Sequence, residues 1–238
     1  MEYMIKPYSH RAWLLEFKTS GTNKDGFSKT LCLNILRLAE RFKTQSPSWE
    51  EVVPGYNSLL LKTRHDMRTE QMSAQVKAAI DGFKPLKTAK PAKDPLEIAV
   101  NYGGEAGPDL ERVAKACGLT PEEVIARHCG RDYLVCMMGF IPGFAYLSET
   151  DPTIHVPRRT DPRLHVPGGS IGLAGWQTGI YGLSSPAGWQ IIGQTSLTLF
   201  DASAPTPFLL KAGDWVRFVP QNSKSKPKKT RQKKVYNV

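Results

Sequence analysis

The chain of 238 residues lacks the long apolar and cysteine-rich segments that would assign it to several large protein classes. No run of apolar residues approaches the ~20 needed to cross a bilayer, and the N-terminus has no apolar stretch typical of a signal peptide. We therefore expect a cytoplasmic protein that does not enter a membrane. The four cysteines form no CxxC pair and have no zinc-like spacing with histidine. This pattern favours buried thiols over a disulfide framework or a metal site.

The motifs of the best-known nucleotide sites are also absent from the sequence. It contains neither a Walker A sequence nor a GxGxxG fingerprint, so it offers no familiar cradle for phosphates. None of its cysteines lies in a recognised catalytic context. The sequence therefore does not indicate an active site that is complete within this one chain.

The net charge of +10 is carried mainly by the C-terminal end. Residues 221–238 hold seven positive charges and no acid, which leaves only +3 for the rest of the chain. This tail is polar and has no hydrophobic period, so we expect it to be disordered. A basic tail can contact nucleic acid or acidic surfaces, but a solvated extension is the interpretation we favour.

The first 88 residues are predicted to form a small α+β domain. The expected elements are a strand at 12–17, a helix at about 27–43, two strands within 50–63 and a helix at about 72–83. The helices are expected from apolar residues that recur at helical spacing, and the strand pair from a turn at Pro54-Gly55. The segment 84–95 is rich in Lys and Pro, which is typical of a linker. We place the start of the second domain at residue 89.

Residues 89–220 are predicted to form a mainly β domain that contains two short helices. The expected elements are a strand at 98–102, helices at 110–117 and 121–129, a buried strand at 132–140 and a closing strand at 214–220. Asp109 can cap the first helix, and Gly118 ends it. Thr120 and Glu123 form a capping box for the second helix, with Pro121 at its first position.

Glycine is concentrated between Gly139 and Gly193, where ten of the twenty glycines of the chain occur. Short apolar runs separate them, which predicts short strands joined by tight Gly and Pro turns. Glycine also allows the backbone to approach a ligand closely. One interpretation is a β-barrel with many turns. The other, which we favour, is a pocket lined by backbone N–H groups and a few polar side chains.

Arg158 and Arg163 are the strongest candidates for binding a ligand. They lie in an extended, proline-rich segment, VPRRTDPRLHVP, in which proline reduces the freedom lost on ordering. A guanidinium group binds carboxylate or phosphate with two parallel hydrogen bonds. A pre-ordered arginine pair therefore suits an anionic substrate, although a salt bridge at the rim of the barrel is an equally simple interpretation.

Three polar residues of the glycine-rich region are further candidates for substrate contact. Gln177 and Thr178 lie in the sequence GWQTGIY, and Gln194 lies near the end of the region. Glycines on both sides of the first two let the backbone approach a ligand, and an amide side chain can donate and accept hydrogen bonds at once. We assign Gln177 a catalytic role and the other two a binding role.

His128 is expected at the C-terminal end of the helix at 121–129. A cation is favoured at that end of a helix, so a capping role is the simplest interpretation. The alternative is a general acid or base, or a group that binds an anion, that faces the barrel. The helix pair at 110–129 also has the spacing of a helix-turn-helix, but Glu122 and Glu123 would then face DNA phosphates. We therefore favour a structural helix pair over one that binds nucleic acid.

Several long segments together resemble one known family. GFIPGFAYL (139–147), PRRTDPRLHVPGGSIGLAGWQTGIY (157–181) and SSPAGWQIIGQT (184–195) are similar, almost in register, to the pattern of the KipI family, also called allophanate hydrolase subunit 1. The resemblance extends upstream to residues 51–61 and 102–128. Three residues depart from the pattern: Trp176, Gly182 and Ala187. Because Trp176 directly precedes Gln177, it could narrow or reshape the pocket.

The resemblance implies an α+β fold in which a small N-terminal α+β domain is followed by a cyclophilin-like β-barrel domain. It implies a hydrolase, the B subunit of an ATP-dependent 5-oxoprolinase, which opens 5-oxoproline to glutamate. In such an enzyme Arg158 and Arg163 would hold phosphate or carboxylate, Gln177 would orient the amide, and His128 would move a proton. ATP would be shared with a partner. The implied partners are a KipA-like subunit, of the allophanate hydrolase subunit 2 family, and a third subunit that hydrolyses the lactam.

Two other functions stay compatible with the resemblance. Some members of the family inhibit a sensor histidine kinase, and a cyclophilin-like groove could hold a proline-containing segment of such a kinase. The chain could also be a component of a urea or allophanate carboxyltransferase. It has no biotin-attachment lysine motif, so that activity would need a separate biotin carrier.

Overall fold

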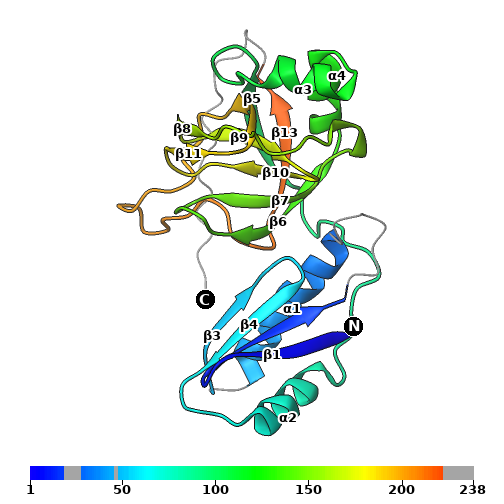
Figure 1. Cartoon of the computed structure of the whole chain (residues 1–238), viewed down its shortest axis with the longest axis vertical. Coiled ribbons are helices and arrows are strands. Elements are labelled where there is room, and N and C mark those ends of the chain that lie inside the picture. The colour runs from blue at the N-terminus through cyan, green and yellow to red at the C-terminus, as the bar shows by residue number, and fades with distance from the viewer. Residues whose placement is uncertain (19–27, 46–47, 222–238) are drawn as a thin grey trace.

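The computed structural model describes residues 1–18, 28–45 and 48–221, and it places a β-barrel above a smaller β-sheet (Figure 1). The smaller sheet and two helices form the N-terminal part, and a closed β-barrel with two helices forms the C-terminal part. This arrangement confirms the expected α+β fold with a small N-terminal layer and a barrel. The predicted domain limit at residue 89 stays a prediction. The basic tail, apart from Gln221, lies outside the described residues.

The N-terminal sheet has four antiparallel strands in the order β1-β2-β4-β3. The strands are β1 (Tyr3–Ser9), β2 (Ala12–Phe17), β3 (Trp49–Pro54) and β4 (Ser58–Thr63). On β2 the alternating side chains of Trp13, Leu15 and Phe17 are buried, as the period of a strand requires. They form one core with side chains of α1 (Lys29–Gln45) and α2 (Thr69–Ile80).

The C-terminal barrel closes in the strand order β10-β7-β6-β13-β5-β12-β9. Its strands are β5 (Leu96–Tyr102), β6 (Asp132–Met138), β7 (Ala145–Glu149), β9 (Ser170–Ala174), β10 (Gln177–Ile180), β12 (Gln190–Gln194) and β13 (Trp215–Pro220). The pair β13–β5 is parallel, and the other neighbouring strands are antiparallel. A separate two-stranded sheet, β8 (Arg163–Val166) with β11 (Ser185–Ala187), and a short 3-10 helix, η1 (Pro152–Ile154), complete this part.

Two short helices, α3 (Leu110–Cys117) and α4 (Pro121–Cys129), cover one end of the barrel (Figure 1). As predicted, Gly118 ends α3 in the left-handed conformation, and Thr120 and Glu123 form a reciprocal capping box for α4. Asp109 also occupies the N-cap position of α3, as predicted, but its side chain makes no capping hydrogen bond to the helix. That carboxylate binds a cluster of arginines instead.

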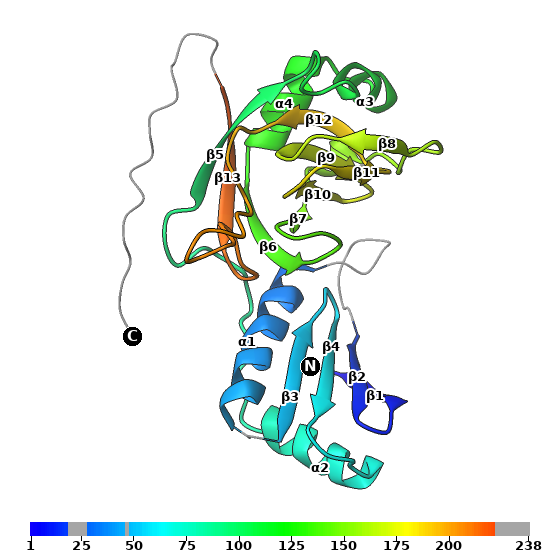
Figure 2. The ribbon, with the colours of Figure 1, turned by 90° about the vertical axis from the view of Figure 1, so that its left-hand side faces the viewer.

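The two parts contact each other where α1 meets β6 (Figure 2). Cys32 and Leu36 on α1 pack with Leu134 and Cys136 on β6, and all four side chains are buried or nearly so. The thiol of Cys32 donates to the carbonyl of Cys136 over 3.6 Å. The free thiols thus behave as small apolar groups, as expected for buried cysteines. No helix within the described ranges is long and apolar enough to span a membrane.

Candidate functional site

An aromatic cluster lies on the outer surface of the barrel strands β9 and β10. Its buried rings are Phe144, Tyr181 and Trp189, with Phe144 4.8 Å from Tyr181 and 5.7 Å from Trp189 between centroids. Gly172 and Gly179 face each other across the two strands. A Cβ on Gly179 would lie 3.0 Å from the rings of Phe144 and Trp189, and one on Gly172 would lie 2.9 Å from the Cβ of Trp189, so glycine at both positions lets these side chains pack closely on the sheet.

Arg158 is an exposed cation at the edge of this cluster. Its guanidinium carbon lies 5.9 Å from the ring of Trp189, within the range of a cation–π contact. Burial raises the pKa of Tyr181 to about 12, and the nearby charge of Arg158 opposes that rise. Among the residues that the structure describes, Arg158 forms no ion pair. It therefore keeps a guanidinium group available for an anionic ligand.

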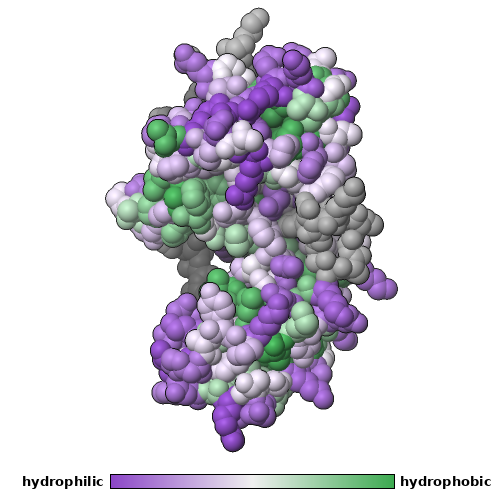
Figure 3. Space-filling model, viewed as in Figure 1, coloured by the Kyte–Doolittle hydropathy of each residue, from purple (hydrophilic) through white to green (hydrophobic). Residues whose placement is uncertain are grey.

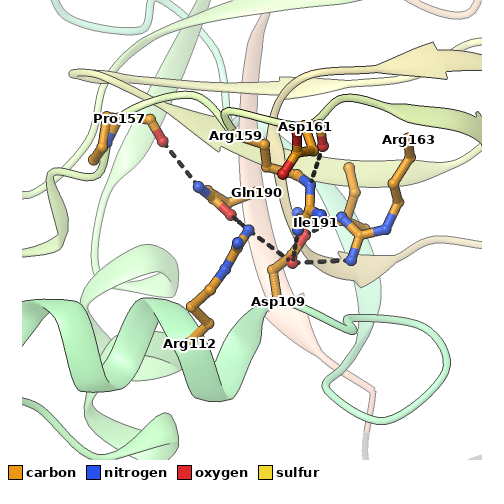
Figure 4. Close-up of polar contacts among 8 residues, drawn as sticks. All are labelled: Asp109, Arg112, Pro157, Arg159, Asp161, Arg163, Gln190 and Ile191. Atoms are coloured by element: carbon orange, nitrogen blue, oxygen red, sulfur yellow. Dashed lines mark hydrogen bonds and ion pairs between the residues drawn. The ribbon is translucent and has the colours of Figure 1, made fainter.

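Arg163 is held differently, by the nearly buried carboxylate of Asp109 (Figure 4). Its two terminal nitrogens donate to the two carboxylate oxygens over 2.6 and 2.9 Å, which is the two-pronged geometry expected for an arginine. Arg159 and Arg112 donate to the same carboxylate over 2.9 and 3.0 Å. A fifth bond comes from the backbone N–H of Ile191 over 2.7 Å. This group of one carboxylate and three arginines is the Asp109 cluster.

The charges around Asp109 keep it ionised. Burial acts to raise the pKa of the carboxyl group, but the hydrogen bonds from Arg163 and from the N–H of Ile191, with the charges of Arg163 and Arg112, lower that pKa below its ordinary value. The single negative charge faces three positive charges. The cluster therefore keeps a net positive charge at neutral pH.

His128 and Thr178 come together inside the barrel, away from the aromatic cluster. His128 is fully buried, stacks on Phe218 at 4.5 Å, and lies 2.9 Å from the hydroxyl of Thr178 through Nε2. That hydroxyl donates its one proton to the carbonyl of Gly172, so Nε2 must be the donor to Thr178. Nδ1 then accepts from the hydroxyl of Tyr102 over 2.7 Å. The imidazole is thus a neutral group with both nitrogens satisfied.

Burial, with a smaller contribution from the charge of Arg131, lowers the pKa of His128 to about 3. The ring therefore carries no charge at neutral pH and has no exposed surface. Its predicted position at the end of the helix is confirmed. Its catalytic role stays a prediction, since proton transfer to a ligand would require the barrel to open.

Gln177 and Gln194 lie at two further places on the barrel. Gln177 donates to the carbonyl of Leu147 over 3.4 Å and lies beside Tyr56 of the N-terminal part, so it belongs to the junction of the two parts. Gln194 donates to the carbonyl of Gly168 over 3.0 Å. Both amides are half-buried and partly committed to backbone groups.

The structure therefore separates the residues that the sequence grouped into one pocket. Only His128 and Thr178 touch each other, while Arg158, Arg163 and Gln177 belong to three different groups of contacts. Trp176 packs against His155 with a tilted ring, at 4.3 Å between centroids. Its influence on a pocket stays a prediction.

Two signals were missed in the sequence. Asp109 looked like a helix cap, and nothing local reveals the arginines that bind it. Residues 168–172, GGSIG, also have the GxSxG spacing of a serine nucleophile. In the structure Ser170 begins a strand, is buried, and donates to the carbonyl of Pro167 over 2.7 Å. The strand–turn–helix context that such a nucleophile requires is not formed around it.

Comparison with known proteins matches most of the chain to one family. The family described as the carboxyltransferase domain, subdomain C and D, matches residues 3–210. A protein of Escherichia coli O157:H7, named as the B subunit of 5-oxoprolinase, is 43% identical over 188 residues, which cover 79% of this chain and 84% of that protein. A Bacillus subtilis protein of the same name is 52% identical over 124 residues, which are 52% of each chain.

A solved structure shares the fold within a longer chain. The crystal structure of TTHA0988 superposes with a TM-score of 0.72 at 33% identity and covers 91% of this chain. The match covers only 41% of the TTHA0988 chain, so the present chain spans less than half of that protein. On the family match and the identity to these relatives, the chain belongs to the carboxyltransferase domain family, subdomain C and D.

Proposed function

We propose that the chain is the B subunit of an ATP-dependent 5-oxoprolinase, a hydrolase that opens 5-oxoproline to glutamate in the cytoplasm. The observation that carries this proposal is the 43% identity, over most of both chains, to a protein named as the B subunit of 5-oxoprolinase. The exposed guanidinium group of Arg158 beside an aromatic cluster supports the proposal. 5-Oxoproline is a small ring that bears a carboxylate, which such a group can bind.

In this proposal Arg158 binds the substrate carboxylate. Arg163 supports the site without touching the substrate, because both of its terminal nitrogens already bind Asp109. Gln177 is the candidate for orienting the lactam amide, and its place at the junction of the two parts suits a site that a second protein completes. Thr178 and His128 support the barrel beneath it, and Gln194 stays a candidate for binding only.

ATP binds at a site shared with the partner subunit in this proposal. Of the two arginines that the sequence offered for phosphate, Arg163 is bonded to Asp109, as is the nearby Arg159. A phosphate would have to compete with a buried carboxylate that is already in place. The lactam oxygen would be phosphorylated by ATP and the ring opened in a partner subunit. This chain would then supply substrate binding.

The proposed partners are a KipA-like protein, of the allophanate hydrolase subunit 2 family, and a third subunit that hydrolyses the lactam. The exposed apolar side chains of the barrel give a surface for such contacts: Phe140, Leu164, Leu183, Phe208 and Leu209. Apolar surface gathers on the side of the barrel formed by β8, β11 and the loop before β13 (Figure 3). Large exposed apolar areas commonly mark protein interfaces.

Reconstitution tests the proposal. The chain is assembled with a KipA-like subunit and a lactam-hydrolysing subunit, and ADP release is measured with and without 5-oxoproline. We expect release that depends on 5-oxoproline and an Arg158→Gln variant with a raised KM. As a matched control, Asp132→Asn breaks an exposed ion pair with Arg217 elsewhere on the barrel and should leave KM unchanged. A complex that forms but releases no ADP in response to 5-oxoproline would refute the assignment.

A further inference from the structure

Three arginines bind Asp109 at the N-terminal end of α3, and a fourth, Arg158, lies next to one of them in the chain and over Trp189. Arg112, Arg159 and Arg163 all form ion pairs with Asp109, whose side chain is 3% exposed. Among the described residues Arg158 has no such partner and is exposed. The four side chains are chemically alike, so their neighbours alone decide which one can bind a ligand.

A hydrogen bond holds the chain to the barrel immediately before Arg158. The side-chain amide of Gln190 donates to the carbonyl of Pro157 over 3.0 Å (Figure 4). The carbonyl oxygen of the same amide accepts from Arg112, which also binds Asp109. Gln190 is 7% exposed and lies on β12, so it links the segment to a barrel strand.

Further hydrogen bonds hold the chain immediately after Arg158. The backbone N–H of Arg159 donates to the carbonyl of Gly188 over 2.8 Å, and its guanidinium group donates to Asp109 over 2.9 Å. Its Nε also donates to the carbonyl of Asp161 over 3.0 Å, which closes the segment on itself (Figure 4). The residues on both sides of Arg158 are therefore held by groups that converge on Asp109.

We propose that Asp109 is a positioning residue: it fixes the segment 157–163 so that Arg158 stands over Trp189 as a pre-ordered anion-binding group for the substrate carboxylate. The inference rests on the proposed function, since it assumes that Arg158 binds the substrate. Asp109 itself touches no substrate, because three guanidinium groups and a backbone N–H surround its carboxylate.

The physical reason is electrostatic as well as geometric. Without a carboxylate at position 109, three neighbouring guanidinium groups, two of them half-buried, would repel one another and lose their shared acceptor. The segment would then sample other conformations, and ordering it again would cost free energy each time a ligand binds. A misplaced charge near the reacting groups commonly costs about 10- to 100-fold in activity.

A double-mutant cycle in the assembled complex tests this inference. The variants are Asp109→Asn, Arg158→Gln and the two combined, with KM and kcat for 5-oxoproline measured for each. We expect Asp109→Asn to raise KM roughly tenfold with a smaller change in kcat. We expect no further rise when Asp109→Asn is added to Arg158→Gln, because the carboxylate then has no ligand-binding arginine to position.

Hydrogen exchange gives a readout that does not depend on activity. In Asp109→Asn the backbone amides of residues 158–161 and 163 should exchange faster, while those of β6 and β13 should be unchanged. If Asp109→Asn does not fold, Arg159→Gln takes its place, because it removes the side-chain hydrogen bonds of Arg159 to Asp109 and to the carbonyl of Asp161 and leaves Asp109 paired with Arg163 and Arg112. Asp132→Asn is the control for loss of an aspartate–arginine pair.

The outcomes separate this inference from the proposed function. Unchanged exchange in 157–163, or a KM effect of Asp109→Asn that persists in full beside Arg158→Gln, would overturn the positioning role. An Arg158→Gln variant with normal KM would overturn it as well, because there would be no ligand contact to position. A wild-type complex without 5-oxoproline-dependent ADP release would instead remove the proposed function itself.

Discussion

The stability of the barrel should depend on pH through one buried group, His128. Its pKa falls from 6.5 in the unfolded chain to about 3 in the folded protein, because burial penalises the charged ring. Between these two values the unfolded chain binds a proton that the folded protein does not. The stability that the neutral ring contributes is therefore fully present above about pH 6.5 and is lost as the pH falls towards 3.

The size of the effect follows from the same two pKa values. Each pH unit between the two pKa values corresponds to about 1.4 kcal/mol. Protonation of His128 in the unfolded chain should therefore lower the free energy of unfolding by about 2 kcal/mol between pH 7 and pH 5. With a typical urea m-value of about 2 kcal/mol per M, the urea concentration at which half of the barrel is unfolded should fall by about 1 M. Asp109, whose pKa is lowered, loses its contribution only as the pH falls below about 4, outside this window.

The assay compares wild type with His128→Gln by urea unfolding at pH 7, 6 and 5. Glutamine retains hydrogen-bonding groups that can face Tyr102 and Thr178 but cannot titrate. The four other histidines are common to both proteins, so their effects cancel in the difference. We expect the variant to be less stable than wild type at pH 7. The difference between their free energies of unfolding should be about 2 kcal/mol smaller at pH 5. A deficit that stays constant over this range would show that His128 is not buried as a neutral ring.

Three further changes test the packing and the cluster. Phe140 is 63% exposed and has a φ of 68°, so Phe140→Gly, which relieves that backbone strain but loses ring contacts, should alter the unfolding free energy by less than about 1 kcal/mol in a thermal melt. A Cβ at Gly107 would overlap the carbonyl oxygen of Ile192, so Gly107→Ala should destabilise the barrel by about 2–3 kcal/mol, and an unchanged urea midpoint would contradict that geometry. Arg163→Lys should cost about 1–2 kcal/mol in the same assay, since lysine cannot bind both oxygens of Asp109, and a wild-type midpoint would show that the pair is dispensable.

Local signals in the sequence predicted much of the fold. The strand at 12–17, the end of α3 at Gly118 and the capping box at Thr120 were all correct, because each depends on neighbouring residues. Strand β1 was missed. It includes Pro7, and most of its side chains are exposed, so only its pairing with β2 makes it a strand. Long-range pairing of that kind leaves little trace in the local pattern.

The contacts of His128 could have been anticipated from helical spacing. Val124 lies four residues earlier on the same face of α4, and both side chains are buried. A histidine in line with an apolar residue at that spacing faces the core. The alternation of a strand gives a similar lesson for Gln177 and Thr178, since consecutive residues of β10 point to opposite faces. The two could not line one pocket together.

The role of each arginine could not be predicted, because it depends on one carboxylate about fifty residues away. The segment from Pro157 to Arg163 contains three arginines, and its spacing says only that they are close in the chain. Asp109 binds two of them, whereas Arg158 has no ion-pair partner among the residues that the structure describes. A guanidinium group that is already satisfied gains little from an incoming anion, whereas an unpaired one gains a charge-assisted hydrogen bond. The most conspicuous ion pair in this region is therefore evidence against Arg163 as a ligand contact and in favour of its neighbour Arg158.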